Sequence, residues 1–168
     1  MRQRLWLVWL ACILAVVGTQ AQDFASKYMN ENASDSTLTC ISVSPKMMEE
    51  ILESSVGKND TTGMADIIAR LKSMQIVSSQ EKGKTHFRQA EELARKNSAR
   101  FKELASYDEG DDRCRIFVRE QKEQIVELVL LRQHDGQFTV IDFTGDMNRD
   151  FIGQLTHTML PAPPGNEQ

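Results

Sequence analysis

The sequence predicts an α+β domain with a mainly antiparallel sheet, a C-terminal three-strand meander and helices packed on one face. Amphipathic stretches with a helical period alternate with β-branched stretches along the first two thirds of the chain. Strand-like segments joined by short polar turns fill most of the last third. The composition agrees with one ordinary globular domain, since 40% of the 168 residues are hydrophobic and only 9 are Gly and 4 are Pro.

The first 21 residues are predicted to be a secretory signal peptide. Arg2 and Arg4 precede an unbroken apolar run over 5–17, and small residues then allow cleavage after Ala21. The apolar run is shorter than the roughly 20 residues that a membrane-spanning helix needs. We therefore expect cleavage and export rather than anchoring.

The processed chain is expected to hold a single domain over 22–158 and a disordered, Pro-rich tail over 159–168. Lipidation at Cys12 is not expected, because Trp9 stands where a lipobox has leucine. No second long apolar run occurs, so no integral membrane span is predicted after cleavage.

The charge balance disfavours nucleic acid as a partner. Cleavage of the signal peptide removes Arg2 and Arg4. The processed chain then has 24 acidic residues and 18 of the 20 basic ones, a formal charge of about −6. An acidic chain without a clustered basic face is poorly suited to phosphate backbones or anionic headgroups. The expected partner is therefore another protein.

The first part of the domain is predicted to alternate helices and strands. Phe24 and Tyr28 lie four residues apart on one face of the first helix, and Ser44 with Pro45 caps and opens the second. The first strand is expected to be buried on at least one side. In chain order the expected elements are a helix over 23–30, a strand over 36–43, a helix over 45–55, a loop over 56–63, a helix over 64–73 and a strand over 74–78.

The second part is predicted to hold one long surface helix and then the meander. The pair Asp135-Gly136 is the strongest hairpin signal in the chain. The expected elements are a helix over 81–106, an acidic turn over 108–112, strands over 113–119, 124–132 and 137–143, a turn over 144–147 and a helix over 148–156.

Arginines alternate with apolar residues on the first meander strand. Cys114, Ile116 and Val118 are expected to face inward on a one-sided sheet, with Arg113, Arg115, Phe117 and Arg119 on the opposite side. Glu127 on the next strand could pair with one of these arginines. The arginine row reads as a solvated face that protects a sheet edge, and an anion-binding site is the alternative.

Asp146 follows Gly145 at the end of the last strand. One interpretation is that Gly145 supplies an unusual backbone angle and Asp146 caps the final helix. The other is an exposed carboxylate that takes part in binding. We therefore treat Arg113, Arg115, Arg119 and Asp146 as weak interaction candidates.

Two cysteines remain after cleavage, Cys40 and Cys114, each in a strand-like segment. Export would place them where disulfides persist, and a bridge requires the two strands to be close and correctly phased. The alternative is that they are free, since a buried free cysteine behaves as a small apolar residue. The sequence leaves both open.

The sequence offers no catalytic, cofactor-binding or metal-binding constellation. His86, His134 and His157 lack the spacing of zinc ligands, and each is expected to be exposed to solvent. Phosphate-binding glycine loops, nucleophile elbows and zinc-protease motifs are absent from the sequence. No cofactor is expected.

Several segments together resemble a known family. Ser42 to Met48 after a strand, the stretch 68–76, and the block 125–155 with Phe143-Thr-Gly-Asp146 resemble the exported bacterial family catalogued as domain of unknown function 4252. The resemblance covers about residues 24–156. It implies an envelope protein of a Gram-negative bacterium with no assigned activity, located in the periplasm or at the periphery of the outer membrane, and it supplies no site residues.

Two functional hypotheses follow from the sequence. The favoured one is a non-enzymatic protein-interaction module of the cell envelope. The alternative is a small-ligand-binding protein or hydrolase whose site is assembled from dispersed residues. The sequence specifies neither the partner nor an oligomeric state.

Overall fold

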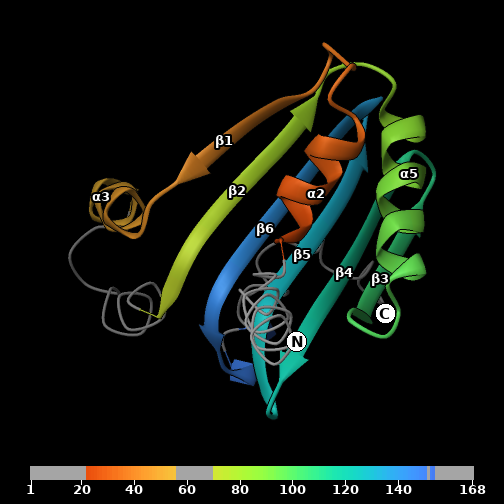
Figure 1. The fold of residues 1–168 in the computed structure, drawn as a ribbon. Helices are drawn as coiled ribbons and strands as arrows, with labels where there is room; N and C mark the ends of the chain where they lie inside the picture. The colour runs from red at the N-terminus through yellow and green to blue at the C-terminus, as the bar shows by residue number, and fades with distance from the viewer. Residues whose placement is uncertain (1–21, 56–69, 151, 154–168) are drawn as a thin grey trace, which may run out of the picture.

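Six antiparallel strands form one sheet in the part of the chain that the computed structural model describes, namely residues 22–55, 70–150, 152 and 153 (Figure 1). This confirms the predicted α+β class. The elements are α2 (Phe24–Glu31), β1 (Thr39–Val43), α3 (Pro45–Ser55), β2 (Leu71–Ser79), α5 (Gly83–Lys96), β3 (Lys102–Glu109), β4 (Asp112–Gln121), β5 (Gln124–His134) and β6 (Gln137–Met147).

The sheet is a meander of four strands with a hairpin-like extension. Consecutive strands β3 to β6 pair in turn, and β2 then pairs with β6 and β1 with β2. The resulting order is β1-β2-β6-β5-β4-β3, so β1 and β3 are the two edges. Asp135 and Gly136 connect β5 to β6 with positive φ angles of 48° and 77°, which confirms the predicted hairpin.

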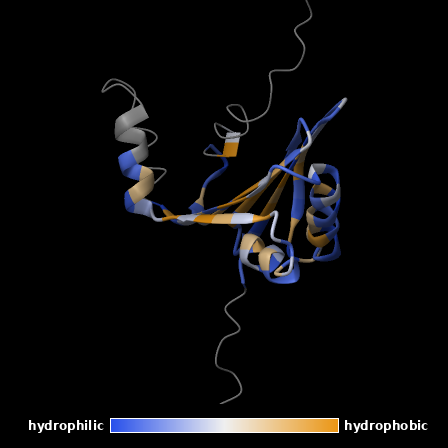
Figure 2. Ribbon diagram, turned by 90° about the horizontal axis from the view of Figure 1, so that it is seen from above, coloured by the Kyte–Doolittle hydropathy of each residue, from blue (hydrophilic) through white to orange (hydrophobic). Residues whose placement is uncertain are grey.

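Helices α2 and α5 cover one side of the sheet, called here the helix face (Figure 2). Their aromatic and small residues pack on the inward side chains of the strands, and Phe24, Tyr28, Phe87 and Phe138 are at most 2% exposed. Figure 2 shows α3 beyond the β1 end of the sheet, away from α2 and α5. The predicted placement of helices on one face therefore holds for α2 and α5.

The opposite side, called here the outer face, is apolar as well. A second cluster lies on it, and among the described helical residues Met48 of α3 and Ile152 belong to this cluster. Phe117 packs on the helix face while Ile116 and Val118 lie on the outer face. The prediction of a one-sided sheet is thus wrong, because both sides of the central strands bury apolar residues.

The long helix predicted over 81–106 is wrong in its second half. Helix α5 ends at Lys96, where Asn97 caps it and the Asn97 side chain donates a 2.7 Å hydrogen bond to the carbonyl of Leu93. Residues 102–109 form β3, which pairs with β4. The helical spacing of Phe101 and Leu104 was misleading, because cross-strand pairing outweighs local periodicity.

Two further boundaries differ from the expectation. Residues 71–73 belong to strand β2 and not to a helix, because Leu71 and Ser73 pair with Gly145 and Thr144. The segment 144–147 continues strand β6 and is not a turn. Strand β1 is also mostly exposed, with only Val43 buried, in contrast to the predicted strand buried on one side.

The strand predicted over 36–43 begins only at Thr39, and the acidic turn predicted over 108–112 is shorter, because β3 extends to Glu109 and β4 begins at Asp112. The remaining predicted elements of the described part are confirmed. The first helix, the helix opened by Ser44 and Pro45, and the three meander strands occur at the expected places. The Ser44 Oγ accepts a 3.3 Å hydrogen bond from the Met47 N–H, as expected of a cap. The signal peptide, the 56–63 loop, most of the 64–73 helix, the tail and part of the 148–156 helix lie outside the described residues.

Candidate interaction surface

The N-terminus of α2 is bound to the sheet by two buried carboxylates that the sequence did not single out as a pair. The Phe24 N–H donates to Glu127 Oε1 at 2.7 Å, and the Ala25 N–H donates to Asp142 Oδ2 at 2.8 Å. Glu127 and Asp142 are at most 1% exposed. They satisfy helix donors that have no intrahelical partner, so their role is to hold α2 on the helix face.

Two of the predicted interaction candidates are used inside the protein. Arg119 Nε donates to Glu127 Oε2 at 2.5 Å, which confirms the pairing expected between strands. Arg115 forms ion pairs with Glu91 at 3.0 Å and Asp108 at 2.8 Å. Because both guanidinium groups are engaged and their side chains are only 13% and 12% exposed, neither offers a free anion site.

The other two candidates lie at the surface and are far apart in the fold. Arg113 is exposed near the tip of the β3–β4 hairpin, 3.8 Å from Asp108. Asp146 is exposed on β6, where its N–H donates to the Arg70 carbonyl at 3.1 Å. Asp146 therefore stands within a strand instead of capping a helix, and a binding role for these two residues stays a prediction.

Cys40 and Cys114 are both free, and the structure separates them. Cys40 is exposed on β1, whereas Cys114 is buried on β4, and three strands lie between them. Cys40 is 3.9 Å from Gln75 on the helix face, while Cys114 belongs to the outer-face cluster. An intramolecular disulfide is therefore excluded by this arrangement. Burial raises the pKa of the Cys114 thiol to about 11.

His86 was expected to be exposed, but it is 1% exposed. Its Nδ1 lies 3.1 Å from the Tyr28 hydroxyl and its Nε2 lies 3.2 Å from the Thr37 hydroxyl. Thr37 Oγ1 also donates to Asp35 at 2.7 Å. This network joins the loop after α2 to α5, and burial of Tyr28 raises its pKa above the ordinary value. This network could not be predicted from the sequence, because the three segments meet only in the fold.

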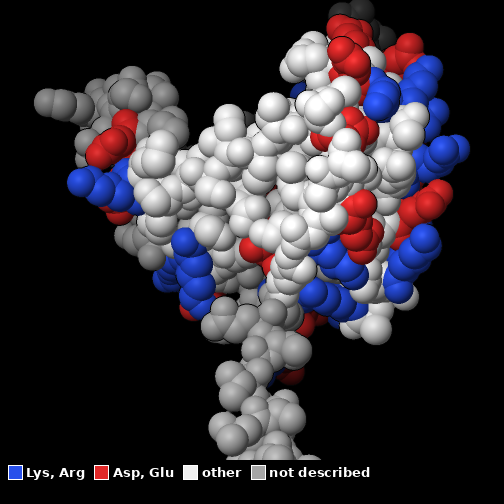
Figure 3. Space-filling view, turned by 45° about the horizontal axis from the view of Figure 1, so that its top comes forward, with Lys and Arg blue, Asp and Glu red and all other residues white. Residues whose placement is uncertain are grey.

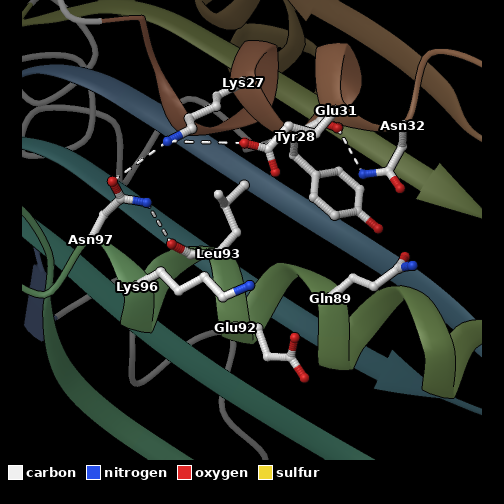
Figure 4. Close-up of a pocket in the computed structure, with 9 residues that line it drawn as sticks. All are labelled: Lys27, Tyr28, Glu31, Asn32, Gln89, Glu92, Leu93, Lys96 and Asn97. Atoms are coloured by element: carbon white, nitrogen blue, oxygen red, sulfur yellow. Dashed lines mark hydrogen bonds and ion pairs between the residues drawn. The ribbon is translucent and has the colours of Figure 1, made fainter.

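A groove of about 470 Å³ lies between α2 and α5 (Figure 4). Charged side chains of both signs line it, including Lys27, Glu31 and Lys96. Figure 4 shows Lys27 bonded to Asn97 across the groove, a contact of 3.4 Å between the two helices. Of the interactions drawn there, this hydrogen bond joins the two helices, and the others lie within one helix or its cap.

The described residues contain no group of three or more His, Cys, Asp or Glu side chains placed to hold a metal ion. Within the same residues, no helix is both long enough and apolar enough to cross a membrane. Neither result identifies a function.

Strand β1 is an edge that no other described strand covers. It pairs only with β2 among the described strands, and Thr39, Cys40, Ile41 and Ser42 are all exposed. An edge strand presents unpaired backbone N–H and C=O groups to any extended chain that approaches. No charged residue, proline or bulge interrupts β1. We call Thr39–Ser42 the β1 edge.

Strand β3, at the other edge, carries the protective features that β1 lacks. Lys102, Glu103, Asp108 and Glu109 place charges at both of its ends. Its pairing with β4 shifts register between Glu103 and Ala105, which marks a bulge or irregularity. Charges and bulges are the means by which proteins prevent strands from adding to a sheet edge. The two edges therefore differ in their ability to accept a strand.

An aliphatic row crosses the outer face and opens toward β1. Ile41, Ile76, Ile141, Leu130, Ile116 and Ala105 lie in register on β1, β2, β6, β5, β4 and β3. Ile116 and Leu130 are 1% and 3% exposed, Ile76 and Ile141 are half-buried, and Ile41 is 57% exposed. The outer face is thus covered at its centre and open at the β1 end.

Few charges surround the β1 edge. The last charged residue before the strand is Asp35 and the first after it is Lys46, so ten consecutive positions, 36–45, are uncharged. Figure 3 shows a broad area without Lys, Arg, Asp or Glu between the charged groups near α3 and those on the α5 side. An uncharged edge with an exposed isoleucine is the strongest candidate surface in the described structure.

The described residues form a small α+β protein with an exposed, uncharged sheet edge at β1. The chain belongs to the family described as Domain of unknown function (DUF4252), whose model matches residues 28–155. This confirms the resemblance found in the sequence. The curated proteins contain no match to the chain.

Proposed function

We propose that this protein is an exported, non-enzymatic interaction module of the cell envelope that binds a protein chain at the β1 edge. One observation carries the proposal: β1 is uncharged, unbulged and exposed, whereas the opposite edge, β3, has charges and a register shift. A partner strand would gain backbone hydrogen bonds along β1 and apolar contact with Ile41. The predicted signal peptide and the acidic composition support an exported protein that binds protein.

A second candidate is a small-ligand-binding protein that uses the groove between α2 and α5. The groove volume of about 470 Å³ favours it, since ligand sites commonly fall in this range. Its lining is largely polar, and Lys27 in the lining already pairs with Glu31 in the same helix and donates a hydrogen bond to Asn97 at the end of α5. The β1 edge is therefore preferred.

Cross-linking in intact envelopes followed by affinity capture tests the proposal. The full sequence with a C-terminal tag is compared with Ser42→Lys and Ser106→Lys, which place a lysine at an exposed serine on β1 and on β3 respectively. With the untagged chain expressed beside the tagged one, we expect a stoichiometric protein, either the untagged chain or another envelope protein, to be recovered with the unmodified chain and with Ser106→Lys, and to be lost with Ser42→Lys. A chain that stays in the cytoplasm, or recovery of the same proteins with all three, would contradict the proposal.

A further inference from the structure

We infer that the β1 edge is occupied by a second copy of this chain, which pairs antiparallel with β1 about a two-fold axis at Ile41. The inference rests on the proposed use of this edge for protein binding and names the partner. Two-fold contacts use the same surface on both subunits, so the surface must be complementary to itself. The sequence and the register of β1 meet this requirement.

The side chains of β1 are nearly symmetric about Ile41. In the two-fold pairing Thr39 faces Val43 of the other copy, Cys40 faces Ser42, and Ile41 faces Ile41. Each pair therefore joins residues of similar size, β-branched with β-branched and small with small. Such cross-strand pairs stabilise a sheet, and no like charges are placed opposite each other.

No charge opposes the pairing of two copies along β1. Asp35 is the first charged residue before the strand and Lys46 is the first after it, so positions 36–45 carry no charge. Antiparallel pairing over the strand therefore places no like charges opposite each other. Asp35 itself is held within its own chain by an ion pair of 3.3 Å with Lys82.

The aliphatic row on the outer face also continues across the two-fold axis. Ile41 ends the row that runs from Ala105 through Ile116 and Leu130. Opposite Ile41 of a second copy, its exposed side chain gains an apolar neighbour on the same face. A five-residue strand makes a contact smaller than the roughly 1,200 Å² of standard interfaces, so we expect a reversible dimer.

Sedimentation equilibrium of the processed chain, purified from cells that express the full sequence, measures the dimer directly. The comparison is again between the unmodified chain, Ser42→Lys and Ser106→Lys, with circular dichroism to confirm that all three are folded. We expect Ser42→Lys to weaken dimerisation by about tenfold or more and Ser106→Lys to leave it unchanged. A monomer at every concentration, or equal dimerisation of all three, would overturn the inference.

Disulfide trapping tests the register independently of the lysine variants. In a Cys40→Ser background, Ile41→Cys places two cysteines directly opposite each other, at a Cα separation that a disulfide spans. Ile76→Cys in the same background is the control, since three strand spacings, about 14 Å, would separate its two copies. We expect oxidation to link Ile41→Cys and not Ile76→Cys, and failure of Ile41→Cys to link would overturn the register at Ile41.

The two proposals fail in different ways. If the chain is monomeric but Ser42→Lys still abolishes capture of another envelope protein, the interaction function stands and the second copy is excluded. If Ser42→Lys changes neither dimerisation nor capture, the β1 edge has no role in binding and both proposals are excluded.

Discussion

Asp142 on β6 and Ala25 in α2 are joined by a 2.8 Å hydrogen bond across 117 residues of sequence. The carboxylate accepts the N–H of the helix through Oδ2, while Oδ1 accepts no hydrogen bond from the described residues. Burial, and then the nearby charge of Glu127, raises the pKa of Asp142 well above its ordinary value. The contact that places α2 on the sheet is therefore sensitive to pH.

The sign of this dependence follows from the direction of the pKa shift. Because the pKa of folded Asp142 lies above the unfolded value of about 3.9, its contribution to stability is complete below that pH. The contribution is lost as the pH rises through the folded pKa. We expect Asp142→Asn, which cannot ionise, to gain stability relative to the unmodified protein as the pH rises from about 4.

Urea unfolding at a series of pH values checks this prediction. Asp146→Asn is the matched control, since Asp146 lies on the same strand but is exposed. We expect this control to keep the pH dependence of the unmodified protein. If the stability of Asp142→Asn had the same pH dependence as that of the unmodified protein, the pKa of Asp142 would be the same in the folded and unfolded chain.

Glu127 should be more costly to replace than any exposed carboxylate of the meander. It binds two guanidinium groups, Arg119 at 2.5 Å and Arg100 at 3.2 Å, and is fully buried. Glu127→Gln leaves these cations without their counter-charge, and we expect a loss of about 3 kcal/mol in unfolding free energy. The control is Glu120→Gln, which breaks a surface pair with Lys102 and should cost much less. Equal losses of unfolding free energy in the two variants would show that burial does not raise the cost of replacing Glu127.

Much of the fold could be predicted from the sequence because its signals are local. The hairpin at Asp135-Gly136 and the helix opened by Ser44 and Pro45 follow from turn and capping chemistry that a few neighbouring residues determine. Strand β3 could not be predicted in this way. Its residues have helical spacing, and only pairing with β4, which lies outside any local window, makes them a strand.

The candidate surface was less predictable than the fold. Which strands form the edges depends on the order β1-β2-β6-β5-β4-β3, and the sequence does not encode this order in any single segment. The arginine row looked like a surface because Arg115 and Arg119 alternate with apolar residues. The Arg115 partner Glu91 comes from α5, so this ion pair became visible only when helix and sheet were placed together, whereas the Arg119 pair with Glu127 joins neighbouring strands and was expected.

Acid should weaken the loop that follows α2. Hydrogen bonds from the Thr37 hydroxyl and N–H, and then Lys82, lower the pKa of Asp35 to about 2. A lowered pKa gives stability that is present above the unfolded value and is lost as the pH falls from about 4 to about 2. We expect Asp35→Asn to lack this loss, measured by thermal unfolding between these pH values. Glu81→Gln, at an exposed position near α5, is the control and should retain it.

The start of α5 depends on the absence of a side chain at Gly83. The Gly83 N–H donates to the Gly136 carbonyl at 2.9 Å, and a Cβ on Gly83 would lie 2.2 Å from that oxygen. Backbone atoms of the β5–β6 hairpin cannot move aside as a flexible side chain would. We expect Gly83→Ala to reduce the unfolding free energy by about 2 kcal/mol.

Thr85→Ala is the appropriate control for Gly83→Ala, because Thr85 is exposed in the first turn of the same helix. Equilibrium denaturation should show a change in unfolding free energy within about 0.5 kcal/mol for this variant.

If Gly83→Ala changes the unfolding free energy equally little, the β5–β6 hairpin must shift away from α5 without a loss of stability. The His86 contact to the Tyr28 hydroxyl would then report the shift, since His86 lies one turn further along the helix. Unchanged stability together with an unchanged His86 signal in NMR spectra would show that α5 and the hairpin are not in close contact.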